Sequence, residues 1–152
     1  MSSRSPAPDH RLMGNLATRT IKAGIAYFAL VFGAGFVLGS IRLPFLVPRL
    51  GERVAELVEM PFMFVVILVS ARFFTRRFSL PANDLARLGA GLLALGLLVA
   101  AEILLTVALQ DRSLGEYVAS RDPVSGMVYL AMLALYAVMP LVLARFSSAF
   151  NG

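Results

Sequence analysis

The chain has 152 residues, with no cysteine, no tryptophan and a single histidine, His10. Without cysteine, it has no disulfide, no thiol redox chemistry, no iron–sulfur ligand and no cysteine-based zinc site. His10 lies in a polar N-terminal stretch, which excludes a haem held between two histidines inside an apolar core. The sequence therefore predicts no cofactor and no metal site.

Charge is also scarce. Charged residues make up 15% of the chain and hydrophobic residues 59%, and the mean hydropathy is +0.79. Soluble domains place apolar residues in stripes of period 3.6 or 2, whereas the uncharged blocks here approach the roughly 18 residues that span a bilayer. The predicted fold class is all-α, an integral membrane antiparallel four-helix bundle.

Basic residues exceed acidic ones by 14 to 9. They bracket the apolar segments, as expected of loops that contact anionic lipid headgroups. The predicted partner is therefore the lipid bilayer, and no nucleic acid is expected.

Four spans are predicted, at about residues 21–43, 54–74, 86–109 and 125–145. Residues 1–18 lack a hydrophobic period and are predicted to form a flexible cytoplasmic tail, followed by one membrane domain over residues 19–150. The second span has an uncharged part of only 12 residues, 60–71. A span of adequate length therefore places Glu56 and Glu59 at or below the membrane interface.

The first span carries two spaced patterns. Ala29 and Gly33, then Gly35 and Gly39, are small residues four apart, which would let another helix approach closely, either within the chain or in a dimer. The aromatics at helical spacing are expected to face lipid or another helix, with a cofactor groove as the alternative: Phe28, Phe32 and Phe36.

The distribution of Lys and Arg predicts the orientation. The N-terminal tail, the connection between spans two and three, and the C-terminal segment hold nine, against five in the other two connections. Cytoplasmic segments carry the excess of Lys and Arg. The expected localisation is the bacterial inner membrane, with both termini cytoplasmic.

The candidate site is a cluster of charged residues near the predicted outer face: Glu56, Glu59, Glu102, Arg42, Arg49 and Arg53. The helical rise places Glu59 and Glu102 roughly 8 and 12 Å below the ends of their helices, so the two can meet at a similar depth. An ionised carboxylate at such depth costs about 2.5–3.5 kcal/mol. Each glutamate must therefore be protonated, hydrated or paired, either with one of the three arginines or with the Tyr129 hydroxyl.

Three interpretations of this cluster stay open. The arginines can neutralise the glutamates and fix the helix register. Alternatively, Glu59 and Glu102 can form a protonatable or cation-binding site that opens to the outer face. Finally, the second helix can begin at Pro61, a favourable first helical residue, which would leave residues 52–60 in the interface.

The missing motifs narrow the chemistry. Three carboxylates without cysteine or an intramembrane histidine suit a hard cation better than zinc or copper. No nucleophile–base arrangement lies within the spans, and no phosphate-binding glycine motif is present. No catalytic residue is predicted, although catalysis by paired glutamates stays open on geometry alone.

The pattern R-x-x-x-x-x-P-R-x-G-x-R-x-A-E-x-x-E-x-P over residues 42–61 resembles small four-span bacterial inner-membrane proteins that have no assigned activity. This resemblance covers about the first half of the chain and implies no site. The chain is also similar to small multidrug resistance transporters in its four spans and its membrane glutamates. In that family the glutamate lies in the first span, which is uncharged here, so no site residue is carried over.

These features predict a non-enzymatic inner-membrane protein, an accessory or assembly subunit of a membrane complex. The prediction rests on four spans, little extramembrane mass and the lack of a catalytic motif. The alternative is a small oligomeric proton- or cation-coupled transporter or channel that uses the membrane glutamates. A membrane-protein partner or a second copy of the chain is the expected protein partner.

Overall fold

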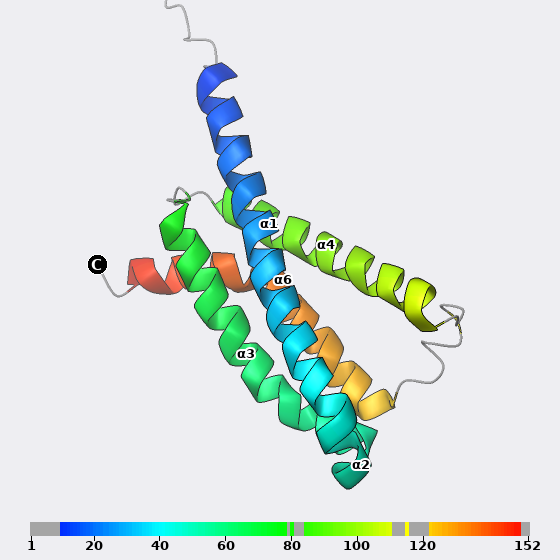
Figure 1. Cartoon of the computed structure of the whole chain (residues 1–152). Helices are drawn as coiled ribbons and strands as arrows, with labels where there is room; N and C mark the ends of the chain where they lie inside the picture. Colours follow the sequence, from blue (N-terminus) through cyan, green and yellow to red (C-terminus); the bar gives the residue numbers. More distant parts are fainter. Residues whose placement is uncertain (1–9, 79, 81–83, 111–114, 116–121, 150–152) are drawn as a thin grey trace, which may run out of the picture.

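The computed structural model describes residues 10–78, 80, 84–110, 115 and 122–149. The main helices are α1 (His10–Ile41), α3 (Glu52–Arg77), α4 (Asp84–Gln110) and α6 (Pro123–Ala149), and two short segments, η1 (Arg42–Leu46) and α2 (Val47–Leu50), join α1 to α3 (Figure 1). Each of the four main helices is long and apolar enough to cross a membrane, with hydropathy of 2.0 to 2.3. The predicted all-helical class with four apolar helices is confirmed for the described residues.

Helix α1 begins earlier than predicted. It starts at His10, so residues 10–18 of the predicted tail are helical, while residues 1–9 lie outside the described residues. Two threonine hydroxyls donate to carbonyls one turn back, Thr18 to Gly14 at 2.9 Å and Thr20 to Leu16 at 3.0 Å. These side chains satisfy their own hydroxyls within the helix, so the polar sequence does not interrupt it.

The interpretation that the second helix begins at Pro61 is wrong. Helix α3 begins at Glu52 and contains Pro61 in its interior. Its first turn follows Gly51, whose φ of 77° gives the sharp turn after α2 that glycine adopts without strain. Ala55 and Glu56 are then buried against the other helices, at 0% and 8% exposure, and this packing holds the turns before the proline in helical form.

Two prolines shape the connection between α1 and α3. Pro44 lacks a backbone N–H, and so does Pro48. The chain responds with a π-helical turn, in which the Val47 N–H donates to the Arg42 carbonyl oxygen five residues earlier. This turn places the Arg42 side chain beside the first turns of α3, where it reaches Glu56 and Glu59.

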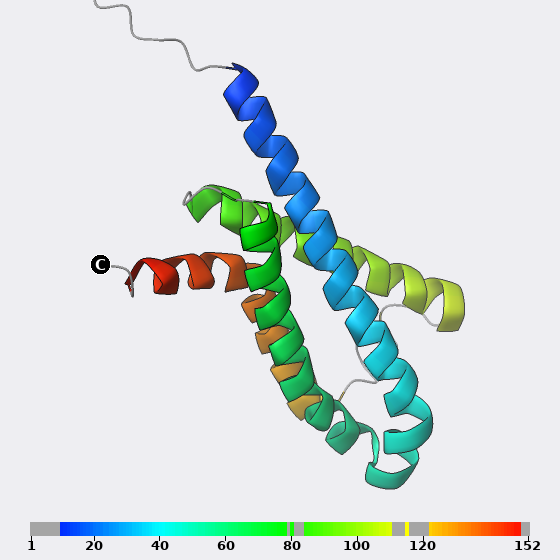
Figure 2. The same cartoon turned by 60° about the vertical axis from the view of Figure 1, so that its left-hand side comes forward.

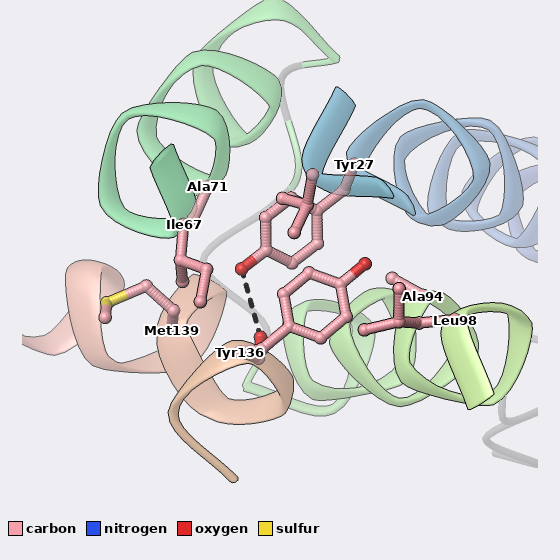
Figure 3. Close-up of a cluster of buried hydrophobic side chains, with 8 residues drawn as sticks. Tyr27, Ile67, Ala71, Ala94, Leu98, Tyr136 and Met139 are labelled. Carbon is pink, nitrogen blue, oxygen red and sulfur yellow. Dashed lines mark hydrogen bonds between the residues drawn. The ribbon is translucent and has the colours of Figure 1, made fainter. Parts of the chain in front are cut away.

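The four main helices form a bundle in which α1 and α6 each pack against both α3 and α4. In both views α4 is inclined to α1 and α3, and its Gln110 end diverges from α3 (Figures 1 and 2). The principal core lies midway along the helices and contains Tyr27, Val31, Ile67, Ala71, Ala94, Leu98, Tyr136 and Met139 (Figure 3).

A hydrogen bond between α1 and α6 crosses this core. The Tyr27 hydroxyl donates to the Tyr136 carbonyl oxygen at 3.1 Å, and the two rings lie 4.6 Å apart (Figure 3). In a regular helix that carbonyl would accept from the N–H four residues later, but residue 140 is a proline. Tyr27 therefore satisfies the backbone acceptor that Pro140 leaves open, at the point where α6 bends (Figure 2).

Close helix contact depends on two glycines that the small-residue pattern did not single out. A Cβ on Gly91 would lie 1.9 Å from the Ala137 carbonyl oxygen, and a Cβ on Gly24 would lie 3.0 Å from the Ala90 carbonyl oxygen. The backbones of α4 and α6, and of α1 and α4, thus touch without an intervening side chain.

We expect Gly91→Ala to lower the free energy of unfolding by about 1–3 kcal/mol, because the new methyl group must push α4 away from α6. Thermal unfolding in detergent, followed by circular dichroism, measures the loss. Gly96→Ala on the same helix is the matched control, since no described atom lies within 4 Å of its Cβ position. Equal stability of the two variants would contradict the contact.

Tyr27→Phe should lower the free energy of unfolding by about 1 kcal/mol, the typical net value of one hydrogen bond. In a Pro140→Ala background the loss should be clearly smaller, because the substituted residue has a backbone N–H that donates to the same carbonyl. A double-mutant cycle from denaturant titrations measures this coupling. Identical losses in both backgrounds would show that Tyr27 does not replace the missing N–H.

Candidate functional site

A cavity of about 290 Å³ lies between the main helices, at the end of the bundle that η1 covers. We call it the acidic cavity, because its charged lining consists of Glu56, Glu59, Glu102 and Arg42. Its other walls are apolar or aromatic, and they come from α1, α3, α4 and α6: Val31, Phe32, Gly35, Phe36, Gly39, Met60, Met63, Ile67, Leu98, Leu105, Tyr129, Met132, Leu133 and Tyr136.

Arg42 joins the end of α1 to the start of α3. Its Nη1 lies 3.6 Å from Glu56 Oε1 and 3.1 Å from Glu59 Oε2. The two glutamates are three residues apart and share one face of α3, so a single guanidinium reaches both. The three side chains are between 11% and 23% exposed, which makes this a largely desolvated ion pair.

The ion pair leaves polar atoms unsatisfied. Although Glu59 Oε2 is close to Arg42 Nη1, the angle does not make a hydrogen bond. Among the described residues, Glu59 Oε2 and Arg42 Nε are buried without a hydrogen-bond partner. Buried polar atoms are normally paired with protein or with ordered water, so these two atoms mark the place where a bound molecule would gain most.

Glu102 reaches the same cavity from α4. The Tyr129 hydroxyl of α6 donates a hydrogen bond to Glu102 Oε1, which is the partner that the sequence suggested for it. Carboxyl groups from α3 and α4 therefore line one space.

The other two arginines of the predicted cluster do not line the cavity. Arg49 is exposed on α2. Arg53 pairs with Asp122 instead of a glutamate, and its Nε donates to Asp122 Oδ2 at 2.8 Å. The structure thus brings Arg42 together with the three glutamates and places Arg49 and Arg53 outside this group.

Sequence reasoning missed Asp122 as a structural residue. Its Oδ1 accepts from the backbone N–H groups of Val124 at 3.0 Å and Ser125 at 3.1 Å, so it caps the N-terminus of α6. The signal was present, because an Asp followed by Pro123 at the first helical position is typical of a helix start. The Arg53 partner, which lies 69 positions away, left no such local signal.

The aromatic pattern of α1 divides between packing and the cavity. Phe28 and Phe32 stack with ring centroids 5.3 Å apart. Phe32 and Phe36 line the acidic cavity, and Phe36 is also 61% exposed on the outer surface of the helix. The three phenylalanines therefore contribute both to packing and to the cavity lining.

The chemistry available to the charged residues of the acidic cavity is limited. In the described part of the chain, no three carboxyl or imidazole side chains come close enough together to hold a metal ion. Comparisons with protein-family models, with curated proteins and with solved structures find no match for this chain. The distinctive feature of the chain is therefore the cavity itself, whose lining holds three carboxyl groups and one guanidinium.

The pKa of Asp122 lies below its ordinary value of 3.8, chiefly because Arg53 donates to its carboxylate, and also because Ser125 and Val124 do so. A lowered folded-state pKa stabilises the fold above pH 3.8, and this contribution is lost as the pH falls through the folded-state value. We expect the melting temperature of the wild type to exceed that of Asp122→Asn at neutral pH and the gap to close in acid.

Melting curves of the two proteins in detergent, recorded from neutral pH downward, measure this gap. Arg53→Gln removes the main cause of the lowered Asp122 pKa. Its melting temperature should therefore also depend less on pH than that of the wild type. If Asp122→Asn lost stability as steeply as the wild type over the acid range, the ion pair and cap would not be the source.

Proposed function

We propose that this protein is an integral protein of the bacterial inner membrane that carries protons or cations across the bilayer, with Glu102, Glu59 and Glu56 as the binding groups. Four long apolar helices support the membrane assignment. The excess of Lys and Arg in alternate connections supports an antiparallel arrangement with both termini in the cytoplasm.

The observation that carries the proposal is that carboxyl groups from two helices line one cavity. Ionisable side chains within a membrane are costly, and they persist where they serve ion pathways or proton relays. Neutralising Arg42 requires one carboxylate, whereas the cavity holds three. The excess is unexplained by helix register alone and is suited to binding and releasing positive charge.

The extent of the cavity fits access from one side. Its lining on α1 and η1 runs from Val31 to Arg42, which at helical rise is about 16 Å, or about half of a hydrocarbon core. Tyr136 lines its inner end, and Tyr27, which lies beyond the lining, is buried. In this proposal a cation enters from the η1 end and is held at the carboxylates.

One observation favours the accessory-subunit hypothesis as a second candidate. Ala29 and Gly33 are exposed, and no described atom lies within 4 Å of a Cβ on Gly33. This small-residue pair is therefore not used for packing in the described chain and is open to a helix of a partner or of a second copy. Mild-detergent pull-downs of the wild type and Gly33→Leu test it. Recovery of the same free monomer from both would reject a stable partner at this pair.

The transport proposal is tested in reconstituted vesicles under an imposed membrane potential, with fluorescent indicators for protons, sodium and potassium. We expect flux of at least one of these ions above protein-free vesicles. Glu102→Gln should lower it about tenfold or more, since it removes a charge-assisted interaction. Glu52→Gln is the matched control, because Glu52 is exposed and lies outside the cavity lining. No flux of any of the three ions, or full flux in Glu102→Gln, would reject the proposal.

A further inference from the structure

The acidic cavity combines a charge imbalance with apolar walls. Three carboxyl groups and one guanidinium line it, so its formal charge is negative when these groups are ionised. Arg42 is already matched by Glu56 at 3.6 Å and Glu59 at 3.1 Å. The charge that the cavity would accept is therefore positive.

A divalent metal ion does not fit this site well. Hard cations take six or more oxygen ligands, or keep much of their water. In the part of the chain that the structure describes, no three acidic or histidine side chains converge on a common point. Most of the lining is aromatic, aliphatic or methionine, which suits a cation that carries its own apolar surface.

An independent observation comes from the inner end of the cavity. Tyr136 is 1% exposed, and within the described residues its hydroxyl has no hydrogen-bond partner. Its carbonyl oxygen is satisfied by Tyr27, whereas its hydroxyl points the other way, toward Ala94 and Leu98 of α4 (Figure 3). Tyr136 and Leu98 both line the cavity. The Tyr136 hydroxyl is therefore a polar group at the inner end of a mostly apolar lining.

We infer that the acidic cavity binds a small organic monocation, an ammonium group with aromatic or alkyl substituents. The ammonium lies near Glu102, and the substituents lie along Phe32, Phe36 and Met63. The inference rests on the proposed function and names the class of its substrate. A volume of about 290 Å³ sits at the lower limit of drug-binding pockets and selects a compact molecule.

Equilibrium dialysis of the full chain in detergent tests this with two probes of similar size and opposite charge, phenyltrimethylammonium and benzenesulfonate. We expect saturable binding of the cation and none of the anion. Glu102→Gln should weaken binding about tenfold or more. Phe36→Ala should weaken it about fivefold through the lost ring contact.

Matched controls separate the site from general effects. Glu52→Gln changes an exposed carboxyl, and Phe45→Ala removes a ring that is 59% exposed in η1 and outside the cavity lining. Both should bind like the wild type. Circular dichroism and size-exclusion chromatography verify folding, and if Glu102→Gln does not fold, the comparison of Phe36→Ala with Phe45→Ala decides.

The outcomes distinguish this inference from the proposed function. Absence of binding, equal binding of both probes, or unchanged affinity in Glu102→Gln and Phe36→Ala would overturn the organic-cation site. Glu102-dependent flux of protons, sodium or potassium without phenyltrimethylammonium binding would also overturn it while leaving the transport proposal standing. Binding that requires Glu102 and Phe36 supports the inference even where vesicle flux is absent, and that result would reject transport alone.

Discussion

The structure depends on the hydrogen bond from the Tyr27 hydroxyl to the Tyr136 carbonyl oxygen, because a buried backbone carbonyl needs a hydrogen-bond partner. In an apolar environment each backbone polar group must find its partner within the protein. Pro140 removes one partner, and a side chain from a different helix replaces it. The bend of α6 thus follows from a single missing N–H, and the Tyr27 hydroxyl links α1 to α6 across the core, although each of these helices packs mainly against α3 and α4. The rings of Tyr27 and Tyr136 lie side by side at this point.

Helix packing differs between the middle of the bundle and the end near η1. Around Gly24 and Gly91 the backbones of α1, α4 and α6 are in direct contact, which leaves no room for a side chain. Toward η1, α4 diverges from α3, and the space is lined by charged and aromatic groups (Figure 1). The close contacts thus lie beside the core, and the cavity lies between the core and η1.

The parts of this structure that follow from local sequence were predictable. Apolar run lengths gave four membrane-long helices, and helical rise placed Glu59 and Glu102 at compatible depths. The start of α3 was ambiguous, because Pro61 favours a helix start locally and only the burial of Ala55 and Glu56 decides against it. The roles of Gly24, Gly91 and the Arg53–Asp122 pair depend on which backbones cross at which residues, and no local pattern encodes that.

The fixed-register and the cation-binding interpretations of the charged cluster share residues. Arg42 with Glu56 and Glu59 meets the requirements of a register-fixing pair, since it ties the π-helical turn to the first turns of α3. Glu102 comes from another helix and accepts from Tyr129, so that pair ties α4 to α6. Fixing the helix register requires no space between these two pairs. Both pairs nevertheless line one cavity of about 290 Å³. Each pair therefore meets the requirement of register on its own, and the space beside three carboxyl groups is the feature on which the proposed binding rests.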